Sequence, residues 1–131
     1  MPLAPGTRLL ATAAALLAAV AAGLAAAGSH VLSALLSPAD LRSFNTAVAF
    51  QFVHALGLFA VAWARERLAG SRLAASSGWL LLTGILLFCG SIYAARLGMT
   101  GSPGPAAPLG GSLVIAGWLV LAAAFLSWKN R

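Results

Sequence analysis

The stretch LLATAAALLAAVAAGLAAA, residues 9–27, contains nineteen residues and no charge. At 1.5 Å per residue, a helix of this length covers the hydrocarbon core of a bilayer, which is about 30 Å thick. A secretory signal peptide is the alternative, with Arg8 as its charged region and residues 25–27 as its cleavage site. The apolar core of a signal peptide usually has only about 7–15 residues. We therefore interpret the stretch as a retained membrane span.

Three further apolar runs follow, at residues 47–63, 78–95 and 109–128. Of the 131 residues, 61% are hydrophobic and 8% are charged, whereas a soluble domain carries roughly 25% charged residues. Disorder is excluded because it requires low hydrophobicity. Within lipid the backbone must satisfy its own hydrogen bonds, so the runs are expected to be helices. The sequence predicts an all-α integral membrane four-helix bundle, with residues 1–131 as a single transmembrane domain.

The basic residues predict an orientation in the membrane. With four spans, the N-terminus, the connection 65–77 and the C-terminus lie on one side. That side holds Arg8, Arg65, Arg67, Arg72, Lys129 and Arg131. The other side holds only Arg42 and Arg96. The positive-inside rule then places both termini in the cytoplasm. We expect a multi-pass protein of the bacterial inner membrane, with lipids rather than nucleic acid as partners, despite the net charge of +6.

The connection 28–46 is the longest between two spans. Apolar residues recur at helical spacing within it, which predicts a short interfacial helix over residues 30–36. Ser37-Pro38-Ala39-Asp40 is typical of a helix start, with Ser37 as cap and Pro38 in the first turn. The second helix is therefore expected to run from residue 38 to about residue 64. Pro108 likewise suits the start of the fourth helix.

Small residues recur at spacings that place them on common helix faces. We select Gly23, Gly84, Gly90, Gly110 and Gly117 as packing positions. In lipid, close backbone approach through small residues drives helix association. Packing within one bundle is the simpler interpretation, and packing between protomers is the alternative. A homo-oligomer, or a subunit of a larger membrane complex, is expected.

Polar side chains inside spans are costly and are functional candidates for that reason. Gln51 and His54 are three residues apart, hence neighbours on one helix face. Ser91, Tyr93 and His30 complete the set of candidate polar or ligand contacts. His54 suits a proton relay or a ligand contact. The alternative is a structural hydrogen bond to Ser91, Tyr93 or a backbone carbonyl.

The sequence gives little support for a metal, haem or catalytic site. The single cysteine, Cys89, cannot form an internal disulfide and is interpreted as a small buried hydrophobe. His30 and His54 are offset along the membrane by on the order of 15 Å, too far to ligate one haem iron. The two acidic residues, Asp40 and Glu66, lie outside the apolar runs. We expect no enzyme activity, no cofactor and no metal.

Three motifs carry a family resemblance. Residues 44–56, FNTAVAFQFVHAL, resemble the pattern F-x-T-A-V-x-Y-Q-x-x-H-A-L. Residues 84–93 resemble G-x-x-L-F-S-G-S-x-Y, and residues 108–111 with 117–118 are similar to a closing P-x-G-G and G-W signature. These patterns are typical of the small membrane proteins catalogued as domain of unknown function 423, which include bacterial YgdD-like and animal transmembrane-protein-256-like proteins. The resemblance covers about residues 25–118.

The chain departs from that family at three places. Phe50 replaces a tyrosine, Cys89 replaces a serine, and residues 25–31 replace a glycine-rich G-A-F-G-A-H-G segment. The resemblance implies a four-helix inner-membrane protein and supplies no activity. We expect a non-enzymatic structural or accessory protein. The alternative is a binder or conduit for a lipid- or quinone-like molecule through Gln51, His54 and Tyr93, and a small channel or transporter is a third class.

Overall fold

The computed structural model describes residues 2–128 and contains four long helices joined by short connections. Each helix is long and apolar enough to cross a membrane. This confirms the predicted all-α membrane fold and the multi-pass character of the chain. The elements are α1 Pro5–His30, the short 3-10 helix η1 Leu32–Ala34, α2 Pro38–Arg67, α3 Arg72–Arg96 and α4 Ala106–Ser127.

The helices extend beyond the apolar runs from which they were predicted. α3 begins at Arg72 rather than near residue 78, because the Ser71 hydroxyl caps it by accepting a hydrogen bond from Ala74 N at 3.3 Å. The start of α2 is as predicted, and the Ser37 hydroxyl accepts from Asp40 N at 3.1 Å. α2 ends at Arg67, three residues later than expected. A hydropathy criterion does not detect polar residues at helix ends, although a capping side chain can make these residues part of the helix.

The short helix predicted over residues 30–36 is shorter in the structure, and its position at the membrane interface stays a prediction. α1 continues to His30, and only a single 3-10 turn, Leu32–Ala34, follows before the cap of α2. Besides the 3-10 bonds, one α-type bond forms here, from Leu36 N to the carbonyl oxygen of Leu32 at 2.9 Å, and it is not continued into a second turn. Leu35 is 73% exposed at this end of the molecule.

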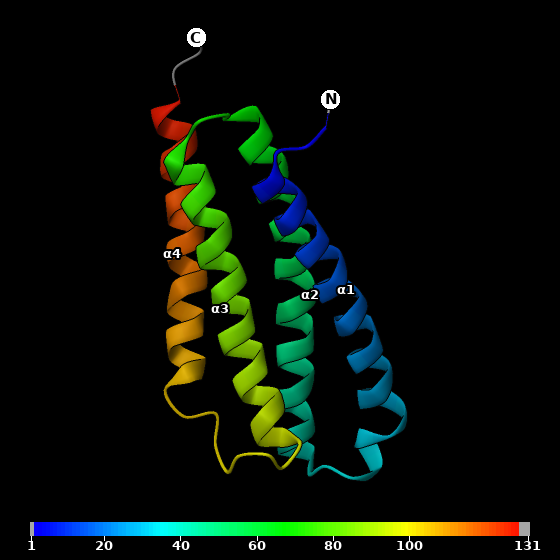
Figure 1. The fold of residues 1–131 in the computed structure, drawn as a ribbon. Coiled ribbons are helices and arrows are strands. Elements are labelled where there is room, and N and C mark those ends of the chain that lie inside the picture. Colours follow the sequence, from blue (N-terminus) through cyan, green and yellow to red (C-terminus); the bar gives the residue numbers. More distant parts are fainter. Residues whose placement is uncertain (1, 129–131) are drawn as a thin grey trace.

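The four helices run up and down, and each packs mainly against its neighbour in the chain (Figure 1). The start of α1, the α2–α3 turn and the end of α4 lie together at one end. α3 and α4 form the most extensive contact, followed by α1 with α2 and α2 with α3. Within residues 2–128 no extensive contact joins α1 to α4. α1 and α4 therefore form the two outer edges of the series.

Glycines allow the close approach of α3 and α4. A Cβ atom added at Gly84 would lie 2.7 Å from the carbonyl oxygen of Gly110 and 2.8 Å from the nitrogen of Val114. A Cβ atom at Gly117 would lie 2.8 Å from Cγ of Leu81. Gly84, Gly110 and Gly117 thus occupy helix–helix contacts, as the interpretation of packing within one bundle predicts.

Gly23 and Gly90 behave differently. A Cβ atom at either position would meet no atom within 4 Å among the described residues. Both glycines face outward, so the expectation that they pack inside one bundle is wrong. Eleven of the 26 residues of α1 are alanine and most of the others are apolar, so the sequence does not distinguish its inner face from its outer face. Packing of these two glycines between protomers stays a prediction.

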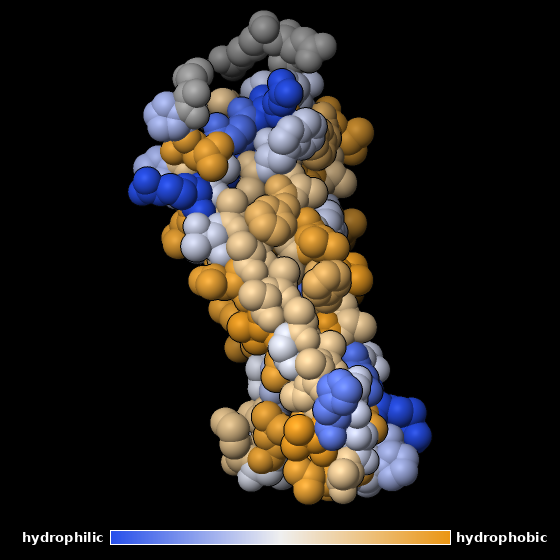
Figure 2. Space-filling view, turned by 90° about the vertical axis from the view of Figure 1, so that its right-hand side faces the viewer, coloured by the Kyte–Doolittle hydropathy of each residue, from blue (hydrophilic) through white to orange (hydrophobic). Residues whose placement is uncertain are grey.

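On the face shown in Figure 2, strongly hydrophilic residues lie toward the two ends and apolar residues cover most of the middle. Arg8, Arg65, Arg67 and Arg72 belong to the end where α1 starts. At the opposite end, Arg96 forms an ion pair with Asp40. Lys129 and Arg131, which were counted when the orientation was predicted, lie outside the described residues.

Candidate functional site

Gln51 links three helices in the interior. The side chain is 2% exposed. Its Nε2 donates to the carbonyl oxygen of Leu17 in α1 at 2.8 Å, and its Oε1 accepts from the Tyr93 hydroxyl in α3 at 2.8 Å. A buried amide without partners is costly in an apolar environment. Gln51 and Tyr93 therefore form a structural network and do not present their polar atoms to a ligand.

Cys89 belongs to the same part of the interior. Its side chain is 2% exposed, and its Sγ donates to the carbonyl oxygen of Ala47 at 3.4 Å. The Tyr93 ring packs against Phe44, with 5.3 Å between ring centroids. As expected, the cysteine is a small buried residue. Together with Gln51, it connects α3 to α2 near the first half of that helix.

His54 is bonded to its own helix on one side only. Its Nδ1 lies 2.8 Å from the carbonyl oxygen of Phe50. A carbonyl only accepts, so Nδ1 carries a proton, and in the neutral form of the ring Nε2 is then a lone-pair acceptor. Nε2 has no hydrogen-bond partner among residues 2–128. It does not belong to the fully buried side-chain atoms that lack a partner, so it is accessible at the surface of the helices. It is therefore an open acceptor within the span.

Aromatic side chains surround His54. The imidazole stacks on Phe50 at a centroid distance of 4.0 Å, and Phe50 in turn contacts Phe88 of α3 at 4.3 Å. Trp118 of α4 lies 6.3 Å from the imidazole. Gly57 makes room for this tryptophan, because a Cβ atom there would lie 2.6 Å from Trp118 Cζ2. α2, α3 and α4 together form an apolar, aromatic surrounding for one hydrogen-bond acceptor.

The other predicted site residues are not brought to His54. The Ser91 hydroxyl donates to the carbonyl oxygen of Phe88 at 2.9 Å, within its own helix. His30 is exposed at the last position of α1. Within residues 2–128 no group of three or more His, Cys, Asp or Glu side chains could hold a metal ion. Of the structural partners expected for His54, neither Ser91 nor Tyr93 bonds to it. The backbone carbonyl that it does contact, that of Phe50, belongs to its own helix and not to another one.

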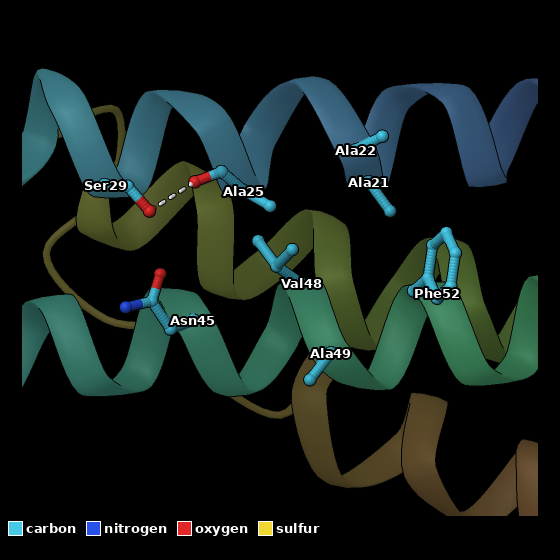
Figure 3. Close-up of a pocket in the computed structure, with 8 residues that line it drawn as sticks. All are labelled: Ala21, Ala22, Ala25, Ser29, Asn45, Val48, Ala49 and Phe52. Atoms are coloured by element: carbon cyan, nitrogen blue, oxygen red, sulfur yellow. Dashed lines mark hydrogen bonds between the residues drawn. The ribbon is translucent and has the colours of Figure 1, made fainter.

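A groove between α1 and α2 was not predicted (Figure 3). It has a volume of about 640 Å³ and lies on the face of α2 opposite His54. Alanines leave this space because they do not fill the gap between the two helices. Its only polar side chains are Ser29 and Asn45, and the Ser29 hydroxyl already donates to the carbonyl oxygen of Ala25. The signal in the sequence was the excess of alanine on facing helices. The lining residues are Ala21, Ala22, Ala25, Ser29, Asn45, Val48, Ala49 and Phe52.

Comparison with known proteins gives consistent matches to uncharacterised membrane proteins. The family described as "Protein of unknown function (DUF423)" matches residues 24–111. The UPF0382 membrane protein YwdK of Bacillus subtilis is 35% identical over 101 residues, which cover 77% of this chain and 82% of that protein. A UPF0382 membrane protein of Haemophilus influenzae is 33% identical over 103 residues, covering 79% and 80%. No solved structure shows significant similarity to the chain.

Proposed function

Because this chain belongs to the DUF423 family of membrane proteins, we propose that it is a non-enzymatic accessory protein that acts by self-association in the membrane. The observation that carries the proposal is the outer face of α1. Ala15, Ala19 and Ala26 are exposed, and together with Gly23 they recur at spacings of three and four residues. Gly23 lies beside them, and a Cβ atom added there would meet no atom within 4 Å in residues 2–128. Small residues at this spacing let two helices approach closely in lipid.

The charge distribution supports a location in the cytoplasmic membrane with both termini in the cytoplasm. The end where α1 starts carries Arg8, Arg65, Arg67 and Arg72. At the other end, Arg96 is neutralised by Asp40 and leaves Arg42 as the remaining arginine. Positive charge in short loops favours the cytoplasmic side. Activity of a reporter enzyme fused to the C-terminus, which is active on one side of the membrane only, tests this orientation.

Native mass spectrometry of the protein released from its membranes tests self-association. We expect a defined oligomer for the wild type. Ala19→Leu adds a bulky side chain to the small face of α1 and is expected to release monomers. Ala123→Leu is the matched control, because Ala123 is also exposed but lies on α4. A monomeric wild type, or equal disruption by both substitutions, contradicts the proposal.

A second candidate function is the binding of a quinone-like or lipid-like molecule. The open acceptor at His54 Nε2 favours it, because a hydroxyl of a hydroquinone can donate to that nitrogen within an apolar surrounding. Gln51 and Tyr93, which were expected to share this role, bond to each other instead. His54 with Phe50 and Trp118 therefore forms the proposed contact set.

Mass spectrometry of molecules that copurify with the protein tests this second function. His54→Ala is expected to remove a bound species that the wild type retains. His30→Ala is the matched control, because it removes the other histidine at an exposed helix end. If His54→Ala retains the same molecules as the wild type, His54 is not a binding residue.

A further inference from the structure

A second cavity lies where three helix ends meet. It has a volume of about 280 Å³ and is enclosed by the start of α1, the end of α2 and the start of α3. Polar and charged groups line it, in contrast to the groove between α1 and α2. The lining residues that the argument uses are Arg65, Glu66, Gly70, Ser71 and Arg72.

The Arg65 guanidinium in this cavity has unused donor capacity. Its Nη1 is buried and has no hydrogen-bond partner among residues 2–128. A buried donor without a partner is costly, and most such groups bond to protein or to bound molecules. Arg72 adds a second cation to the same cavity. The one carboxylate present, on Glu66, already accepts the backbone N–H of Ala4 at 3.1 Å. The two guanidinium groups therefore outnumber the single carboxylate among the residues that line the cavity.

The start of α3 adds backbone donors to the same site. Ser71 caps the helix by accepting from Ala74 N, whereas the first N–H groups of a helix have no partner within the helix itself. These N–H groups and the helix dipole favour a bound anion. Gly70, in the turn before the cap, has a φ of +84°, a conformation that side chains rarely adopt. The wall of the cavity at this turn therefore stays free of a side chain.

The position of the cavity matches the level of lipid headgroups. Trp63 and Trp79, near the end of α2 and the start of α3, are 58% and 43% exposed. The Arg67 guanidinium lies over the Trp63 ring, 5.5 Å from its centroid. Exposed tryptophans are enriched at the boundary between hydrocarbon and water. Arginine pockets at this boundary are suited to anionic headgroups.

We propose that this cavity binds a phosphate group through Arg65, Arg72 and the start of α3, and that an anionic phospholipid supplies it. Arginine suits this role because its planar donors match two phosphate oxygens at once. A phosphate in the cavity would lie beside Arg65 and Arg72, the two guanidinium groups that line it. Free inorganic phosphate has the same chemistry, so the experiment must distinguish the two sources.

The test is native mass spectrometry of the detergent-solubilised full chain with phosphatidylglycerol or phosphatidylcholine added. We expect phosphatidylglycerol to remain bound and phosphatidylcholine to dissociate. Arg72→Gln is expected to weaken phosphatidylglycerol binding about fivefold, which corresponds to about 1 kcal/mol for one basic residue at a membrane surface. Arg65→Gln is a second variant with the same expected direction. Circular dichroism verifies that each variant is folded.

Arg67→Gln is the matched control. It removes the same charge from the same end of α2, yet Arg67 lies over Trp63 and does not line the cavity. If Arg67→Gln and Arg72→Gln weaken phosphatidylglycerol binding equally, the effect comes from the overall positive charge of this end and the proposal is overturned. Equal retention of both lipids by the wild type also overturns it. Displacement of phosphatidylglycerol by inorganic phosphate supports the phosphate site and assigns its ligand to the free anion.

Discussion

The contact between α3 and α4 makes Gly110→Ala the sharpest test of how the helices pack. A Cβ atom at Gly110 would lie 2.8 Å from the carbonyl oxygen of Gly84 and 2.9 Å from Cα of Phe88. Non-bonded atoms of this size pack at about 3.5–4.0 Å. Both neighbours are backbone atoms and cannot rotate away. The methyl group therefore forces α4 away from α3 by several tenths of an ångström or more.

The expected loss of stability follows from two opposing terms. Overpacking costs about 1–3 kcal/mol, and a clash with backbone belongs in the upper part of that range. Replacing glycine by alanine inside a helix gains about 1 kcal/mol in helix propensity. Gly111→Ala separates the two terms. At that position a Cβ atom would lie 3.8 Å from Phe88 Cδ2, an ordinary contact, so only the gain applies.

The measurement is the free energy of unfolding in mixed micelles with an increasing fraction of sodium dodecyl sulfate, followed by circular dichroism. We expect Gly110→Ala to be less stable than Gly111→Ala by about 1–3 kcal/mol, because the propensity term cancels between adjacent positions. Gly111→Ala should equal or exceed the wild type. Equal stability of the two variants would falsify the close backbone contact between α3 and α4.

Of three further predictions, two concern the interior of the bundle and one concerns the start of α2. Tyr93→Phe leaves Gln51 Oε1 without its donor and should lower the free energy of unfolding by about 0.6–1.7 kcal/mol in the same assay; an unchanged value contradicts the network. Cys89 should react slowly with maleimide in the folded protein and fast after unfolding, because its thiol is buried; similar rates argue against burial. Ser37→Ala removes the hydroxyl that accepts from Asp40 N and should cost about 1 kcal/mol. Faster hydrogen exchange at the start of α2 would accompany that loss, and unaltered exchange would speak against the cap.

The sequence predicted those parts of the fold that depend on local chemistry. Four apolar runs gave four helices because a span in lipid must satisfy its own backbone. The cap at Ser37 was predictable because the hydroxyl bonds to the backbone three residues away. The start of α3 at Arg72 was missed because hydropathy does not report polar helical residues. The short helix over residues 30–36 was predicted too long, because apolar spacing does not show that α1 continues to His30.

The candidate site was predictable only in part, because its partners come from other helices. Gln51 and His54 were placed on one face of one helix from their spacing alone. That Gln51 meets Leu17 and Tyr93 depends on how α1 and α3 pack against α2. In lipid the outer face of a helix is as apolar as its inner face, so periodicity does not reveal which residues face a neighbour. For the same reason the outward position of Gly23 could not be predicted.

The contrast between Gln51 and His54 separates the two proposed functions. Both polar atoms of the Gln51 amide are bonded inside one chain, whereas His54 leaves Nε2 open. An acceptor in lipid is stabilised by any donor that reaches it, whether a small molecule or a second copy of the chain. A second copy that docks on the outer face of α1 cannot supply that donor to the same protomer, because His54 faces α3 and α4. Loss of the oligomer in Ala19→Leu with intact ligand retention would therefore show that self-association and the His54 site are independent. Loss of both the oligomer and the ligand in His54→Ala would instead place the protein interface beside Trp118 on α4, and would refute the assignment of the interface to α1.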